Sequence, residues 1–317
     1  MRTIILTTNN VVPNTNNSQF LYKFPGGNVS FTKGNKIALA SFTMFYSTFN
    51  ITATYGNNII YYVWINGIEY EVLIPDGFYT IANLNSYLQQ VMIGNGHYLI
   101  SNANGQYYYF LTFGTNSTAY AFQLNCYNMN STDYPITTGT TGYKYPLSIP
   151  SGAASWVVPT TNITPMFHIT LPGVSNALGF SLGYYPLGGP TFLKDAITNV
   201  GGVYTQATAY TSIQSYLSNL VPQITPLSSF VLTCSLLQNN YAVPNSLLYC
   251  FAPQGTFGSQ FTIQPSGQLS FIDIQPGQYG FFNISILDQN LFPVAIQDPN
   301  MVILLIISDT DDKVGMV

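Results

Sequence analysis

Charged side chains are scarce in this sequence. They make up 6% of its 317 residues, whereas typical globular domains contain about 25%. The chain has 7 basic and 11 acidic residues, and no basic residue lies between Lys36 and Lys144 or between Lys194 and Lys313. A nucleic-acid groove or an anionic-membrane patch requires clustered basic side chains. We therefore expect no specific nucleic-acid partner.

Three further absences narrow the class of protein. Cys126, Cys234 and Cys250 form no C-x-x-C pair and are odd in number, so we expect buried free thiols in a reducing compartment. The most apolar run, Met301 to Ile307, is of strand length, whereas a membrane helix needs about 20 residues. The first ten residues hold too few apolar side chains for a signal peptide. We expect no membrane span and synthesis in the cytoplasm.

Aromatic and uncharged polar residues are abundant instead. The chain has 25 Tyr and 21 Phe, and 47% of its residues are hydrophobic, which is the opposite of a disordered composition. With a net charge of −4, its surface must consist largely of uncharged polar side chains, which give little electrostatic repulsion. This composition suits a subunit whose sides are covered by neighbours.

Strand patterns dominate both ends of the chain. Asn66-Gly67 separates two runs rich in β-branched and aromatic residues, which predicts a hairpin. The runs "YYYFLTF" and "AYAFQLNCY", on either side of "GTNST", predict a second hairpin. Toward the C-terminus, turn residues recur at intervals typical of an all-β sandwich. The run "VILLII" hardly alternates, which indicates a strand buried on both faces.

The middle of the chain is richer in Gly, Pro, Thr and Ser, which indicates loops. A second, weaker helix is predicted at "YTSIQSYLSNL". The fold class that we predict is mainly β: a single jelly-roll β-sandwich built from both chain ends, with an inserted loop-rich β domain and one short amphipathic helix. The expected boundaries are 1–74 and 227–317 for the jelly roll and 75–226 for the insertion.

The amphipathic helix is predicted in "IPDGFYTIANLNSYLQQVM". Thr80 can cap its N-terminus, Leu84 and Leu88 share one apolar face, and the glycines of "GNG" end it. We expect this helix to brace the jelly roll against the insertion. Asp76 precedes the helix in a Pro-Asp-Gly sequence, where it is either a turn former or a working carboxylate, and the turn role is favoured.

Few residues are candidates for a catalytic or metal-binding role. Glu69 and Glu71 share a strand face and could form an acid/base pair about 7 Å apart, although a solvated edge is the simpler interpretation. His97 and His168 lie far apart in the sequence, without a third ligand at zinc spacing. Gly179-Phe180-Ser181-Leu182-Gly183 matches G-x-S-x-G, but no strand pattern precedes it and no helix pattern follows.

The remaining acidic residues also favour structural roles. Asp288 and Asp298 fall in turns, and Asp309, Asp311 and Asp312 belong to an acidic tail without the spacing of a calcium loop. The seven Asn-x-Ser/Thr sequons are expected by chance in so Asn-rich a chain. No glycine-rich phosphate loop is present. We predict no catalytic, cofactor-binding or metal-binding residue, no cofactor and no enzyme activity.

An ordered set of motifs resembles a known family. "KIALASFTMFYSTFNI", "NNIIYYVW", "IPDGFYTIANLNSYLQQ", "NALGFSLGYYP", "FGSQFTIQP" and "GQYGFFNISILDQNLFPVAIQDPNMVILLI" follow one another between about residues 30 and 308. In this order they resemble the penton, or minor capsid, proteins of virophages and Polinton-like double-stranded DNA viruses.

The resemblance implies a function and a set of partners. It implies a structural protein of the virion, made in the host cytoplasm, in which a single jelly roll forms a homopentamer at the vertex of an icosahedral capsid beside the major capsid protein. The alternative from a different class is a receptor- or glycan-binding β-sandwich module on the virion surface. Aromatic residues such as Trp64 and Trp156 would serve that role, and the insertion could contact the host surface.

Overall fold

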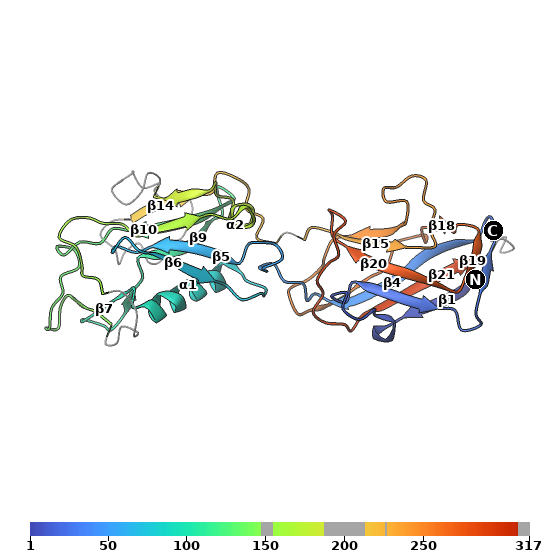
Figure 1. Cartoon of the computed structure of the whole chain (residues 1–317), viewed down its shortest axis with the longest axis horizontal. Coiled ribbons are helices and arrows are strands. Elements are labelled where there is room, and N and C mark those ends of the chain that lie inside the picture. The colour runs from blue at the N-terminus through green and yellow to red at the C-terminus, as the bar shows by residue number, and fades with distance from the viewer. Residues whose placement is uncertain (147–154, 187–212, 226, 310–317) are drawn as a thin grey trace. The chain divides into compact units, whose positions relative to one another are not determined.

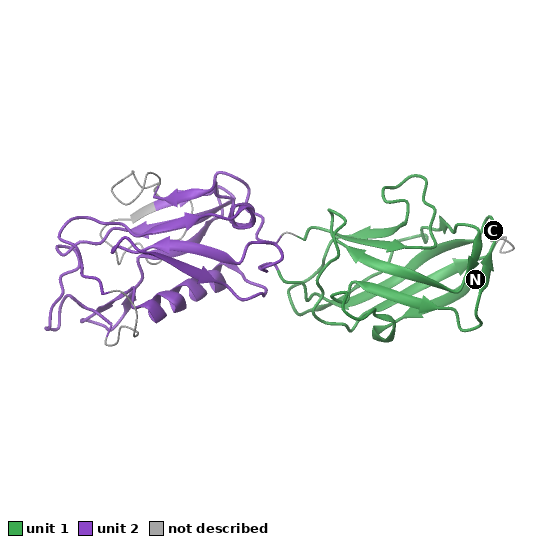
Figure 2. Cartoon of the chain, viewed as in Figure 1, with its two compact units in different colours: residues 1–49, 227–317 green, residues 50–226 purple. Residues whose placement is uncertain are grey.

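A computed structural model describes residues 1–146, 155–186, 213–225 and 227–309. The chain divides into two compact units, with unit 1 formed by residues 1–49 and 227–317 and unit 2 by residues 50–226 (Figure 2). Each unit has its own cluster of buried hydrophobic side chains. Unit 2 is therefore inserted into the chain of unit 1.

Unit 1 is a sandwich of two antiparallel sheets (Figure 1). One sheet has the order β1-β21-β4-β17, and the other has the order β16-β15-β20-β2. Their bounds are β1 Arg2–Leu6, β2 Gln19–Lys23, β4 Lys36–Phe45, β15 Phe230–Cys234, β16 Leu247–Phe251, β17 Gln260–Ile263, β20 Phe281–Leu287 and β21 Val302–Ser308. Counted along the chain, these eight strands pair as 1-8-3-6 and 2-7-4-5, which is the jelly-roll topology. The predicted fold class is confirmed.

Shorter elements complete unit 1. They are η1 Thr8–Asn10, β3 Val29–Phe31, β18 Ile272–Asp273 and β19 Gly277–Tyr279. β18 pairs with β4, and β19 pairs with β3.

Alternation along the strands builds the core of unit 1. Phe282, Ile284 and Ile286 of β20 are buried, and their neighbours in the strand point away from the core. The prediction that "VILLII" is buried on both faces is wrong. Ile303, Leu305 and Ile307 face the core, whereas Val302 is 42% exposed. The outward residues Val302, Leu304 and Ile306 of β21 are apolar, although no described layer of unit 1 covers them.

Unit 2 contains three sheets and two α-helices. The sheet orders are β13-β12-β5-β6, β14-β10-β9 and β11-β7-β8. The bounds are β5 Ile59–Val63, β6 Glu69–Leu73, α1 Ile81–Asn95, β7 Leu99–Ser101, β8 Tyr107–Tyr108, β9 Leu111–Asn116, β10 Ala121–Tyr127, β11 Tyr143–Lys144, β12 Met166–Ile169, α2 Pro172–Leu178, β13 Gly183–Tyr185 and β14 Ile213–Leu217. Both predicted hairpins, β5 with β6 and β9 with β10, are confirmed.

The first predicted domain boundary differs from the observed one. The hairpin of β5 and β6 was assigned to the jelly roll, but it belongs to unit 2, which begins at Asn50. Ile60 and Trp64 are buried in the core of unit 2, and β5 pairs with β12 of the same unit. Sequence alone did not separate this hairpin from the preceding strands because all of them have the same β-rich composition. The chain returns to unit 1 at Leu227.

Helix α1 is built as its sequence predicts. The Thr80 hydroxyl accepts a hydrogen bond from the Asn83 N–H at 3.2 Å, and Gly96 closes the C-terminus with a φ of 71°. Leu84, Leu88 and Met92 are buried in the core of unit 2. The helix therefore packs within unit 2, and the expectation that it braces unit 1 against the insertion is wrong.

In the loop-rich region, one predicted helix is wrong and one observed helix was not predicted. The residues predicted as a second helix begin outside the described part of the chain, and the remainder includes strand β14, which pairs with β10. Pairing with a neighbouring strand overrides the weak helical preference of this segment. Helix α2 was not predicted because it is only seven residues long, from Pro172 to Leu178.

We expect Leu88→Ala to lower the free energy of unfolding of unit 2 by about 2–5 kcal/mol, because it leaves a cavity under α1. Both tryptophans, Trp64 and Trp156, belong to the core of unit 2, so their fluorescence during chemical denaturation reports on this unit. Ile93→Ala is the matched control, since Ile93 lies on the same helix and is 41% exposed. It should change the stability by about 0.5 kcal/mol or less, and equal losses in the two variants would contradict the packing.

Candidate functional site

The outer face of the sheet β13-β12-β5-β6 carries a row of aromatic and charged side chains. The strand register aligns Tyr184 with His168, His168 with Tyr61, and Tyr61 with Glu71. We call these four residues the aromatic row. Because alternate residues of a strand share a face, Phe167 and Tyr62 turn inward and join the core while the row faces outward.

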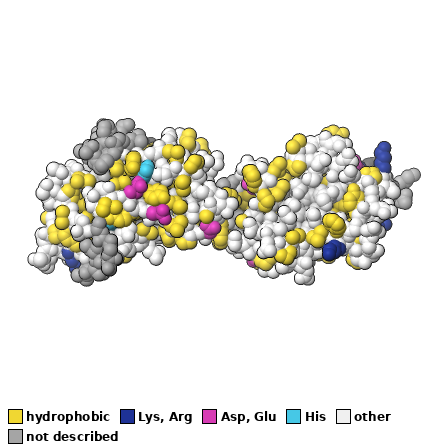
Figure 3. All heavy atoms as spheres, in the orientation of Figure 1, with side chains coloured by type: hydrophobic (Ala, Val, Ile, Leu, Met, Phe, Trp, Pro, Cys, Tyr) yellow, Lys and Arg dark blue, Asp and Glu magenta, His cyan; other side chains and the backbone are white. Residues whose placement is uncertain are grey.

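The row is ordered by contacts among its own side chains and with the neighbouring Glu69. The His168 ring stacks on the Tyr184 ring with centroids 3.8 Å apart. His168 Nδ1 donates to Glu69 Oε1 at 2.5 Å, and the Tyr61 hydroxyl donates to Glu71 Oε2 at 3.2 Å. Figure 3 shows a histidine beside acidic side chains, among hydrophobic ones, on this unit.

Glu69 and Glu71 therefore lie on one outward face, as predicted, and each is bound by a different neighbour. One oxygen of Glu69 accepts a hydrogen bond from His168, and one oxygen of Glu71 accepts a hydrogen bond from Tyr61. The aromatic rings of Tyr61 and Tyr184 lie on the same face. Such a surface can accept hydrogen bonds and stack on a flat apolar group. These are the functions of a binding surface.

A hollow of about 360 Å³ opens beside the row on the same unit. Val63 and Met166 contribute to it from β5 and β12, and Thr161, Asn162 and Thr164 add polar groups. Val63 pairs directly with Glu69 in the sheet. The hollow thus continues the face that carries Glu69.

Ser181 does not have the setting of a nucleophile elbow. The preceding element is helix α2, which ends at Gly179, and the following element is strand β13. This is the reverse of the strand-then-helix order that the motif needs. The Ser181 hydroxyl accepts from Asn219 Nδ2 at 2.9 Å and is exposed. Ser181 instead helps to join the end of α2 to the segment after β14.

His97 lies in the core of unit 2 and has a structural position, not that of a metal ligand. Its ring stacks on Trp64 at 4.6 Å, and its Nδ1 accepts from the Tyr62 hydroxyl at 2.7 Å. Asn95 donates to the same hydroxyl, which leaves the hydroxyl proton for His97. Burial lowers the pKa of His97 to about 3 and raises that of Tyr62 above its usual range. His97 is therefore neutral, and Tyr62 is protonated.

The other residues considered in the sequence have structural positions. Asp76 Oδ1 accepts from the Ala53 N–H at 2.8 Å, so Asp76 links two loops. Asp288 and Asp298 accept from backbone N–H groups in their own turns. Asp311 and Asp312 lie outside the described residues. Trp156 Nε1 donates to the Gly96 carbonyl, and both tryptophans are buried. Neither tryptophan is available as the exposed aromatic contact that was considered for a receptor-binding module.

The three cysteines are free. Cys126 and Cys234 are buried, and burial raises the pKa of Cys234 to about 12 and that of Cys126 further. Cys250 is exposed, so the prediction that it is buried is wrong. Within the described ranges, no cluster of three His, Cys, Asp or Glu residues suits a metal, and no helix is long and apolar enough to cross a bilayer.

Unit 1 carries a second outward surface of distinct character. The neutral face is the outer side of β1, β21, β4 and β17. Its members are Thr3, Ile5, Ser41, Thr43, Phe45, Thr262, Val302, Leu304 and Ile306. Ile5 is 55% exposed and pairs with Leu304. Among the described residues, Lys36 and Asp273 add charge to this side where the strands end.

Comparisons with known proteins give two structures similar over the whole length. No protein-family model and no curated protein sequence matches the chain. It is similar to the crystal structure of the mavirus penton protein, with 11% identity and a TM-score of 0.40, covering 97% of this chain and 99% of that one. It is also similar to a chain of the Sputnik virophage structure, with 12% identity and a TM-score of 0.35, covering 98% of each.

The first of these names contains the words penton protein, and the second contains the word virophage. The family that the sequence motifs resemble is described by the same words.

The folded state of unit 2 should lose stability as the pH falls from about 6.5 toward 3. In this window the unfolded chain protonates His97 and the folded chain does not, because burial lowers the folded pKa to about 3. The loss attributable to His97 should reach at most about 1.4 kcal/mol per pH unit. Denaturation followed by tryptophan fluorescence from pH 8 to 4 measures it. His97→Phe should flatten this dependence, and an unchanged slope would contradict the assignment.

Proposed function

We propose that this chain is a structural protein of an icosahedral virus capsid and that five copies form a vertex. The observation that carries the proposal is the neutral face on the outside of a jelly roll. Ile5, Val302 and Leu304 give it apolar area, and threonine and serine hydroxyls surround them. An apolar sheet face of this kind is typical of a surface that a neighbouring subunit covers.

A closed ring imposes a further requirement that this unit meets. A fivefold ring uses heterologous contacts, so each subunit presents two different surfaces to its neighbours. The sandwich of unit 1 has unlike edges, with β1 and β2 on one side and β16 and β17 on the other. Hollows of about 430 Å³ beside β2 and about 620 Å³ between β16 and β17 shape these edges differently.

In the capsid, a vertex protein is also surrounded by the major capsid protein, which is the second partner we propose. The scarcity of charge supports this environment, because few ions lose water when the faces are covered. The location we propose is the virion. This role depends on contact surfaces and requires no catalytic residue.

We expect Ile5→Asp to prevent assembly while the fold of the subunit is retained, because it places a charge on the apolar part of the neutral face, beside Leu304. Sedimentation velocity and negative-stain imaging of the purified chain should give fivefold rings for the natural sequence and smaller species for the variant. Leu73→Asp, at a residue of unit 2 that is 53% exposed, is the control and should still assemble. A natural chain that stays monomeric at every concentration would exclude the vertex role.

A second function is favoured by the aromatic row. A receptor or glycan on the host surface offers flat apolar faces and hydroxyl groups, which fit the Tyr184 ring and the carboxylates of Glu69 and Glu71. This function belongs to unit 2, whereas the neutral face belongs to unit 1. One chain can therefore perform both.

If the row binds glycans, Tyr184→Ala should weaken retention on a glycan array by about tenfold, because about 1–1.5 kcal/mol of stacking is lost. Tyr120→Ala is the control, since Tyr120 is 75% exposed on the same unit and lies outside the row. Equal retention of both variants, or no retention of the natural chain, would remove this function.

A further inference from the structure

The described basic residues of unit 1 all come from its first 36 residues and lie toward one end of its sandwich. Four of the seven basic residues of the chain are Arg2, Lys23, Lys33 and Lys36. Figure 3 shows Lys and Arg side chains of this unit toward the end at which the N-terminus lies. We call these four residues the basic end.

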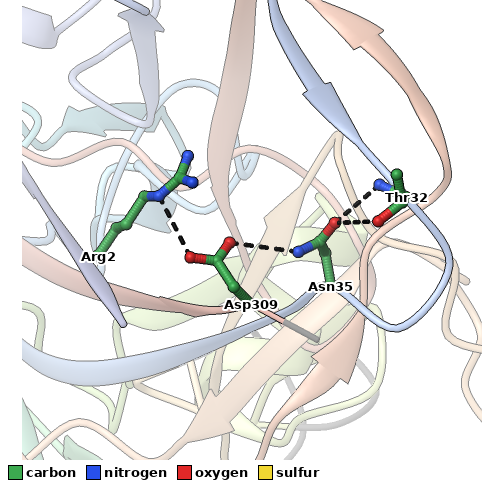
Figure 4. A network of polar contacts seen from close by, with 4 residues as sticks. All are labelled: Arg2, Thr32, Asn35 and Asp309. Atoms are coloured by element: carbon green, nitrogen blue, oxygen red, sulfur yellow. Dashed lines mark hydrogen bonds and ion pairs between the residues drawn. The ribbon is translucent and has the colours of Figure 1, made fainter. Parts of the chain in front are cut away.

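The jelly-roll topology places them together. Arg2 begins β1 and Lys36 begins β4, on the two sides of the end of β21. Lys23 ends β2 in the facing sheet. A network of polar contacts links β1, the end of β21 and the turn before β4, because Arg2 Nε lies 3.3 Å from Asp309 Oδ2 and Asn35 Nδ2 donates to the same carboxylate (Figure 4). Asn35 Oδ1 in turn accepts from Thr32, next to Lys33.

Acidic residues neutralise only part of this charge. Arg2 pairs with Asp309, and Lys36 pairs with Asp273 at 3.7 Å. Both pairs are solvent-exposed, so they are weak. Lys23 and Lys33 are exposed and have no acidic partner among the described residues. Among the described residues, the basic end therefore has four basic side chains against the two carboxylates of Asp309 and Asp273, in a chain whose net charge is −4.

An exposed aromatic ring lies beside one of the free lysines. Phe281 is the cross-strand partner of Lys23, and it is 55% exposed. Directly opposed residues have Cβ atoms about 5 Å apart, so a ligand that contacts the Lys23 ammonium also reaches the Phe281 ring. A cation beside an open aromatic face is the combination that binds single-stranded nucleic acid, since phosphates meet the charge and bases stack on the ring.

We propose that the basic end binds single-stranded nucleic acid without sequence preference. The phosphates contact Lys23, Lys33, Lys36 and Arg2, and a base stacks on Phe281. The four cations lie on separate turns and strand ends of the two sheets, an arrangement that a flexible strand can follow. This inference is independent of the capsid role, because it uses only the charges and the ring at one end of unit 1. Residues beyond Asp309 lie outside the described part and are not included in the site.

The test is the binding of a fluorescein-labelled oligothymidylate to the full chain, followed by fluorescence anisotropy. With four phosphate contacts, log K should fall against log salt with a slope of about −3. Raising the salt from about 50 to about 200 mM should therefore weaken binding roughly 50-fold. The double variant Lys23→Gln, Lys33→Gln should halve this slope, and Phe281→Ala should weaken binding at every salt concentration.

Controls of matched chemistry separate this site from general electrostatics. Lys144→Gln removes one lysine from unit 2, and Phe292→Ala removes a ring of unit 1 that is 67% exposed, so both should bind as the natural chain does. Asp273→Asn should bind more tightly, because it frees Lys36. Thermal unfolding confirms that each variant is folded.

Three results would overturn the proposal. The first is an absence of oligothymidylate binding at about 50 mM salt. The second is equal binding by the natural chain and the double lysine variant. The third is that the lysines are needed for binding to phosphatidylserine vesicles while the oligonucleotide is not bound, which would assign the basic end to a membrane surface.

Discussion

The pairing of β21 with both β1 and β4 is the constraint on which the rest of unit 1 depends. Ile5 pairs with Leu304, so residues from the two ends of the chain form adjacent strands. Closure of a long loop costs only about 0.6 kcal/mol more for each doubling of its length. The fold can therefore accept all of unit 2 between β4 and β15. The same pairing creates the neutral face and brings Arg2 beside Asp309.

Sequence patterns were sufficient to predict those elements whose structure is determined by residues close together in the chain. The Asn66-Gly67 hairpin forms because Gly67 adopts the positive φ of 76° that its turn requires. Helix α1 forms between a threonine cap and a glycine, with Leu84 and Leu88 on the inner face. The jelly-roll class was also predicted, because strand patterns at both ends of the chain enclose a region of different composition. The order in which those strands pair comes from the structure.

Contacts between distant residues were not predictable in the same way. His168 meets Glu69 only because β12 pairs with β5 and β5 with β6, and the sequence contains no signal for the first pairing. Strand β14 was mistaken for a helix because its partner, β10, lies about ninety residues earlier.

The position of the few charges in unit 1 explains how its faces can be covered. Moving an ion out of water costs several kcal/mol even after relaxation, so a charged sheet face opposes burial against a neighbour. Lys36 and Asp273 lie where the strands end, and Asp288 and Asp298 lie in turns. The strands between them present Ile5, Leu304 and hydroxyl groups. Placing charge at the ends keeps hydrated groups on the subunit while its broad faces remain free to assemble.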